Sequence, residues 1–130
     1  MTYRILFTLT LLLLAGCNSG NVGLTGKVTF SDDGSPLPVG SVCFTTDTYF
    51  ARGDLKPDGT FVVGSLKSND GLLPGTYRVH ILGAEKEIGP ETYESLIDKK
   101  FASGATSGIT LNVTASTKHF EIVVDRYQKK

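Results

Sequence analysis

The sequence feature that most constrains the fold lies at residues 70–82, where a turn leads directly into a strictly alternating segment. Gly71 and Gly75 permit a positive φ, and Pro74 fixes φ at about −65°, so these residues favour a tight turn. Residues 76–82 then alternate between apolar and polar side chains. The apolar positions, which share one face of an extended chain, are Tyr77, Val79 and Ile81. The pattern predicts a strand that covers a hydrophobic core with one face.

Six further segments are expected to form strands, and turn residues separate them; the alternation is diluted by Gly53 and by charges in residues 49–56, and residues 61–63 are a short apolar run. The expected strands cover residues 24–31, 41–46, 49–56, 61–63, 109–115 and 119–125. The turn at 56–60 predicts a hairpin between the third and fourth strands of the chain, and residues 116–118 predict another between the last two. Short strands with turns between them predict an all-β fold, a seven-stranded antiparallel β-sandwich.

The alternation stops over residues 83–108, a long stretch for a loop without structure of its own. Tyr93, Leu96 and Ile97 have helical spacing, which predicts one short helix beginning near Pro90 inside this long loop. Because loops carry function more often than the scaffold does, a binding site is expected here if a loop forms one.

The first residues have the features of a secretory signal. Arg4 precedes an apolar run at residues 5–14, which is shorter than the roughly 20 residues that span a bilayer, and small residues end the stretch. Leu-Ala-Gly-Cys at 14–17 resembles the bacterial lipobox, which implies acyl chains on Cys17 as a membrane anchor. In proteins with this motif, an Asp directly after the cysteine is a signal for retention in the inner membrane. This chain has Asn18 at that position, so the resemblance implies the outer membrane. The expected organisation is a signal peptide at 1–16, a lipidated tether at 17–23, the sandwich domain at 24–126 and a polar tail at 127–130.

Charge and cysteine content narrow the possible partners. The chain has 13 basic and 13 acidic residues and no basic patch, which argues against a nucleic-acid partner. With Cys17 lipidated, Cys43 is the only remaining thiol, so no internal disulfide is expected. Cys43 is interpreted as a small hydrophobic side chain.

Six short motifs occur in a recognisable order. They are Gly26-Lys27-Val28, Asp33-Gly34, Pro36-Leu37, Val39–Val42 with Phe44, Asp58–Phe61 and Pro74–Val79. In this order they resemble transthyretin-like, carboxypeptidase-regulatory-like domains, and residues 97–102 followed by 106–110 resemble a bacterial lipoprotein branch of that group. The resemblance implies a prealbumin-like sandwich. It also implies a non-catalytic module of the cell envelope that scaffolds or binds an envelope protein or glycan.

Two other functions remain open beside a structural or protein-interaction module. One is a carbohydrate-binding module, which would need exposed aromatic rings. The other is a hydrolase related to hydroxyisourate hydrolase, but this chain lacks the C-terminal Tyr-Arg-Gly-Ser motif of that enzyme. Its only histidines, His80 and His119, are interpreted as residues of a polar strand face. We therefore expect no enzymatic activity and no cofactor.

The remaining candidate sites have structural explanations. Four aspartates, Asp32, Asp33, Asp58 and Asp70, fall in turns without the ligand spacing of a calcium loop, so no metal is expected. An isopeptide bond between Lys27 and Asn112 would need a buried lysine, whereas alternation places Lys27 on a polar face. Tyr93 and Phe101 are the candidate ligand-binding residues, with the alternative that their rings attach the long loop to the sandwich.

Overall fold

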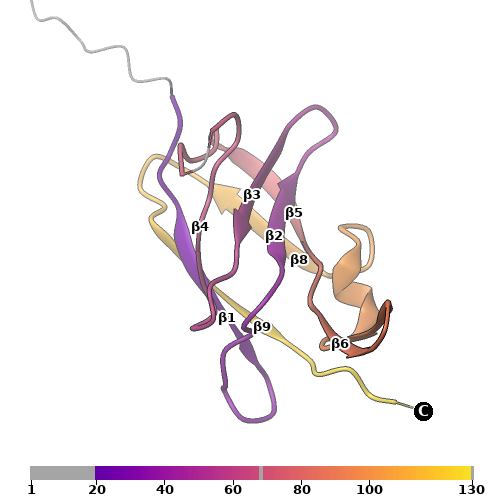
Figure 1. Cartoon of the computed structure of the whole chain (residues 1–130). Coiled ribbons are helices and arrows are strands. Elements are labelled where there is room, and N and C mark those ends of the chain that lie inside the picture. The colour runs from indigo at the N-terminus through magenta and orange to yellow at the C-terminus, as the bar shows by residue number, and fades with distance from the viewer. Residues whose placement is uncertain (1–19, 68, 130) are drawn as a thin grey trace, which may run out of the picture.

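The computed structural model describes residues 20–67 and 69–129, so the predicted signal segment and Cys17 lie outside the described residues. The described chain is all-β (Figure 1). Its elements are β1 (Thr25–Phe30), β2 (Ser41–Thr45), β3 (Phe50–Asp54), β4 (Thr60–Val62), β5 (Gly75–Leu82), β6 (Glu85–Gly89), β7 (Thr92–Ser95), the 3₁₀-helix η1 (Lys99–Ala102), β8 (Ile109–Val113) and β9 (His119–Val124). Each of the seven segments predicted as a strand forms one, and β6 and β7 were not predicted.

Two larger sheets lie face to face, as in a β-sandwich, and a third consists of one hairpin. The first has the strand order β4-β1-β9, the second β3-β2-β5-β8, and β6 pairs with β7. Alternation sets the inward faces as expected, because Tyr77, Val79 and Ile81 are all buried. Polar side chains of the same strand point outward.

Aromatic rings join the two sheets in the core. The ring of Phe44 on β2 lies 6.1 Å from that of Phe61 on β4, and 6.4 Å from that of Tyr77 in an edge-to-face arrangement. The Tyr77 hydroxyl donates a hydrogen bond of 2.6 Å to the Leu73 carbonyl, which satisfies the polar end of the buried ring. Both sheets therefore depend on one cluster of rings for their packing.

The strand pairing differs from the prediction in three ways. β3 and β4 belong to different sheets, so the first predicted hairpin forms only in part: the Lys56 N–H donates to the Thr60 carbonyl at 2.9 Å, and Arg52 and Gly64 form an antiparallel bridge. β8 pairs with β5 and β9 with β1, so the second predicted hairpin is wrong. The β1–β9 pair is parallel, which corrects the fully antiparallel prediction. The connection at 114–118 carries the chain across the sandwich to the end where β1 begins, and the Thr25 N–H donates to the Lys118 carbonyl at 3.1 Å.

Residues 83–108 do not contain the helix predicted near Pro90. Pro90 lies in the turn between β6 and β7, where Glu91 adopts a φ of 53°. Ile97 forms a bridge with Arg126, and the Tyr127 N–H donates to the Leu96 carbonyl at 3.0 Å. The three residues with helical spacing lie on two extended segments. Tyr93 belongs to the exposed strand β7, whereas Leu96 and Ile97 pair with the C-terminal end of the chain.

A short helical turn forms later in the segment and closes the side of the sandwich near β5. This turn is η1, and the Asp98 carboxylate caps it by accepting a hydrogen bond of 3.0 Å from the Lys100 N–H. Ser107, which follows η1, is buried and donates from its hydroxyl to the Val79 carbonyl. The stretch from Leu96 to Ser107 is therefore part of the packed domain rather than a free loop.

The described part of the predicted tether contacts the domain. The Val22 N–H donates to the Leu72 carbonyl at 2.7 Å, and the Leu72 N–H donates back at 3.1 Å. The Asn21 side chain donates to the Asp70 carbonyl at 3.1 Å. These bonds attach the chain before Leu24 to the turn that precedes β5.

Candidate functional site

The two histidines lie in different sheets. His80 is on β5 in the four-stranded sheet, and His119 begins β9 in the three-stranded sheet. The His119 ring contacts the Glu121 carboxylate at 2.7 Å and the Thr25 hydroxyl at 3.2 Å, all on the exposed face of its sheet. The structure therefore does not bring the two imidazoles together.

A different pair, Cys43 and His80, is adjacent across β2 and β5. Burial raises the pKa of the Cys43 thiol to about 11, and desolvation lowers the pKa of His80. A cysteine nucleophile needs the thiolate, which a neighbouring imidazolium stabilises. Both shifts favour the neutral forms instead. Cys43 is 1% exposed, and its thiol contacts the Ser41 carbonyl at 3.7 Å, so it packs as a small side chain.

The turn aspartates use their carboxylates to hold the turns. Asp33 accepts a hydrogen bond from the Ser35 N–H at 2.9 Å, and Asp58 accepts one from the Thr60 N–H at 3.1 Å. Asp70 accepts from the backbone N–H groups of residues 65–67. Within residues 20–67 and 69–129, no group of three or more Asp, Glu, His or Cys side chains is placed to hold a metal ion.

Acid is expected to weaken the turn that Asp70 holds. Hydrogen bonds from residues 65–67 keep the pKa of Asp70 below the ordinary 3.8, and burial opposes them in part. Because the folded-state pKa is the lower one, this stabilisation is complete above the unfolded-state value and is lost as the pH falls through the folded-state value. Melting temperatures from pH 6 to about pH 2 should therefore fall in the acid range. Asp70→Asn should lower the melting temperature at neutral pH and make the acid-induced fall shallower.

Asp47→Asn is the control for this series. The Asp47 side chain is 91% exposed, and its Oδ1 lies 3.2 Å from Nη2 of Arg78 in a solvent-exposed ion pair. Such an exposed pair contributes little to stability. A pH profile of Asp70→Asn that coincides with that of Asp47→Asn would contradict the role assigned to Asp70.

Lys27 and Asn112 are also placed apart. Lys27 is on β1 of the three-stranded sheet, and Asn112 is on β8 of the other sheet, where its side chain accepts a hydrogen bond of 3.4 Å from Thr76. Their side chains occupy the outward faces of opposite sheets. The geometry offers no isopeptide bond between them.

The two candidate aromatic residues have different environments. Phe101 on η1 is 5% exposed and belongs to the hydrophobic core, with the Lys100 ammonium 5.0 Å from the ring centroid. Tyr93 on β7 is 60% exposed. The structure does not bring the two rings into one site, and Tyr93 alone is available at the surface.

Tyr93 belongs to a hairpin, residues 85–95, that we call the acidic hairpin. None of its residues is buried, and Ile88 is 54% exposed. It carries four glutamates and one lysine, Lys86, which lies 4.0 Å from Glu94. A hairpin that contributes no side chain to the core and exposes two large apolar groups is a candidate contact surface.

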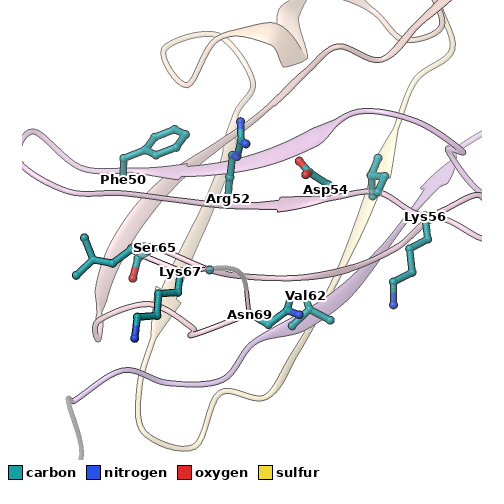
Figure 2. A pocket seen from close by; sticks show the side chains of 11 residues that line it. Phe50, Arg52, Asp54, Lys56, Val62, Ser65, Lys67 and Asn69 are labelled. Carbon is teal, nitrogen blue, oxygen red and sulfur yellow. The ribbon is translucent and has the colours of Figure 1, made fainter.

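A second surface is a hollow beside β3, which we call the basic groove (Figure 2). Its volume is about 500 Å³, and its lining includes Phe50, Arg52, Lys56, Leu66 and Lys67. Figure 2 shows Phe50, Arg52 and Asp54 on the same side of β3. Phe50 is 48% and Leu66 is 94% exposed. The lining has one acidic side chain, Asp54, whose carboxylate accepts a hydrogen bond of 2.6 Å from Ser41.

The sequence contained little sign of either surface. An apolar periodicity arises when one face of a strand is buried. The hairpin has no buried side chain, so its sequence has no such periodicity. The groove combines outward residues of β3 with the segment after β4, and alternation does not indicate which outward residues line a hollow. Only the charges at 85–94 marked this part of the chain as exposed.

Comparisons with family models, with curated proteins and with solved structures found no match. In the part of the chain that the structure describes, no helix has the length and hydropathy required to cross a membrane.

Proposed function

We propose that this chain is a non-catalytic, lipid-anchored protein of the cell envelope whose sandwich acts as a structural or protein-interaction module. The acidic hairpin is its contact surface. One observation carries the proposal: residues 85–95 project from the sandwich without a buried side chain, yet expose Tyr93 and Ile88. Exposed apolar groups within a polar rim are typical of surfaces that bind another protein.

The proposed fold family is the prealbumin-like, transthyretin-like group. Seven strands divided between sheets of three and four support it, together with a parallel pair formed by the first and last strands. The motif at Pro74–Val79 lies where β5 begins at the centre of the larger sheet, next to β2 and β8.

The proposed location is the outer membrane, with lipid on Cys17. The proposed location rests on the lipobox-like residues 14–17 and on Asn18, which lie before residue 20, where the described structure begins. The absence of catalysis is proposed because the imidazoles lie in separate sheets and the thiol pKa is raised. Acid–base catalysis shared by the two histidines would need their rings close together, and a Cys43 nucleophile would need a lowered thiol pKa.

Cross-linking in native envelopes tests the proposal. The full chain, with an affinity tag, is cross-linked and recovered, and mass spectrometry identifies its neighbours. Tyr93→Ser with Ile88→Ser should reduce recovery of the specific partner about tenfold, because exposed anchors of this kind contribute most of the binding energy. Cys17→Ser should abolish membrane attachment.

Val123→Ser is the matched control for the hairpin. Val123 is an equally exposed apolar residue on the outward face of β9 and is not part of the hairpin. Recovery that falls equally for Val123→Ser and for the hairpin variant would contradict the role of the hairpin. Attachment that is unchanged in Cys17→Ser would contradict the anchor.

A carbohydrate-binding module is the second candidate, because the exposed ring of Phe50 stands beside Arg52 in the basic groove. Aromatic rings with neighbouring hydrogen-bond donors suit sugar binding. Binding of the full chain to a glycan array, and its loss in Phe50→Ser, would favour this function. An array without any bound glycan would exclude it for the glycans present.

A further inference from the structure

The carboxylates of the described chain divide into two unequal groups. All but three of them accept a hydrogen bond or form an ion pair with a described residue. The three exceptions are Glu85, Glu87 and Glu91. All three lie on the acidic hairpin, beside the exposed side chains of Ile88 and Tyr93. Unpaired charge of one sign is thus concentrated where apolar groups are also exposed.

The basic groove has the complementary character. Arg52, Lys56 and Lys67 form no ion pair with any residue that the structure describes. The exposed side chains of Phe50 and Leu66 lie among them. Three unpaired cations with two apolar groups therefore match three unpaired carboxylates with two apolar groups. Opposite charges of this kind favour association and set the orientation of the partners.

The two surfaces cannot meet within one copy of the chain. The groove borders β3 and β4, each of which is an edge strand of its sheet, and the segment after β4. The hairpin follows β5, and its return segment pairs at Ile97 with the end of β9, at the opposite edge of the sheet that holds β4. Figure 1 shows β4 and β6 at opposite sides of the molecule. Contact between hairpin and groove therefore requires two copies.

We propose that the acidic hairpin of one copy docks in the basic groove of a second copy, so that the protein forms head-to-tail assemblies. This inference rests on the proposed function, in which the hairpin is a contact surface, and names its partner. Tyr93 enters the groove between Phe50 and Leu66, and the three glutamates face the three cations. A groove of about 500 Å³ has room for one aromatic side chain with its neighbours.

The geometry also determines the type of assembly. Because different surfaces on opposite sides make the contact, the interface is heterologous and generates a chain or a ring rather than a two-fold dimer. One hairpin in one groove buries less than the roughly 1,200 Å² of a standard interface, so the contact is weak in dilute solution. Attachment of many copies to one membrane raises their effective concentration and favours assembly.

Two charge-reversed forms of the full chain test the proposal. The first carries Glu85→Lys, Glu87→Lys and Glu91→Lys. The second carries Arg52→Glu, Lys56→Glu and Lys67→Glu. Contact between copies is measured with a photoreactive benzoylphenylalanine in place of Tyr93, in membranes that hold isotopically light and heavy copies.

The unmodified surfaces should give cross-links from position 93 to groove peptides of another copy. Each charge-reversed form alone should lose about tenfold or more of this cross-linking, because like charges then face each other. Mixing the two forms should restore it, since each hairpin then meets a groove of opposite charge. Melting temperatures report whether the variants fold, and the restored cross-link does so independently.

A third form provides the matched control. It carries Lys99→Glu, Lys118→Glu and Lys129→Glu, three exposed cations outside the groove, and has the same net charge as the groove form. For this comparison only the hairpin-reversed form carries the photoreactive residue. Mixing it with the third form should not restore the cross-link, because the groove of the third form keeps its native positive charge. Restoration by this control would overturn the proposal, because general attraction between opposite net charges would then explain the result.

Other outcomes separate this inference from the proposed function. Cross-links from position 93 to a different envelope protein would overturn self-assembly and support the interaction module. If reversing the groove charges leaves the cross-links unchanged, the groove has no role in the contact. If the groove-reversed form instead loses binding to a glycan, the groove is assigned to an acidic glycan. Cross-links to no protein would overturn both the inference and the role of the hairpin.

Discussion

Gly26→Ala is expected to destabilise the protein by about 3 kcal/mol, the upper part of the range for overpacked sites. Gly26 lies in β1, at the centre of the three-stranded sheet, opposite Phe61 on β4 and Phe120 on β9. A Cβ at this position would overlap both the Phe120 carbonyl oxygen and the Phe61 ring. The ring cannot move freely because it packs on Phe44, and the carbonyl belongs to the β1–β9 ladder.

Urea unfolding of the full chain measures this effect, with Gly23→Ala as the control. No atom lies within 4 Å of the Cβ that alanine would add at Gly23. Its free energy of unfolding should therefore change by less than about 0.5 kcal/mol. A difference between the two variants below about 1 kcal/mol would contradict the close approach of Phe61 and Phe120 to Gly26.

The strands and their inward faces could be predicted because both depend on local alternation. The turn after β3 could be predicted too, and it forms: the Gly59 N–H donates to the Lys56 carbonyl at 2.8 Å. The partner of the next strand could not be predicted. After this turn β4 pairs with β1 in the other sheet, and an antiparallel bridge between Arg52 and Gly64 is what continues the hairpin beyond the turn. Side-chain alternation is the same in either case, because it specifies a face and not a partner.

The candidate site was less predictable than the fold. Tyr93 and Phe101 look alike in the sequence, since each is an aromatic residue in a segment without alternation. Their difference arises from distant contacts. The pairing of Ile97 with Arg126 holds the chain before η1 against the sandwich, which places Phe101 in the core. The hairpin before it has no such partner, so Tyr93 stays exposed.

Phe101→Ala is expected to cost about 3 kcal/mol of folding stability, as removal of a buried phenylalanine generally does. Phe101 is 5% exposed and packs with the core cluster, and η1 lies against β5. Truncation leaves a cavity where the segment from Leu96 to Ser107 meets the sheet. Tyr93→Ala, at an exposed position, should change stability by less than about 0.5 kcal/mol.

Urea unfolding and partner cross-linking of the same variants separate the two roles that were open for these aromatic residues. If Phe101 attaches its segment to the sandwich, Phe101→Ala loses stability, and Phe101→Leu, which refills most of the cavity, recovers much of it. If Tyr93 is a contact residue, Tyr93→Ala keeps its stability and loses the cross-linked partner. Phe101→Ala with unchanged stability and a lost partner would assign Phe101 to the contact surface and contradict its place in the core. Because the expected losses fall in different measurements, one pair of variants tests both the packing of residues 83–108 and their role in binding.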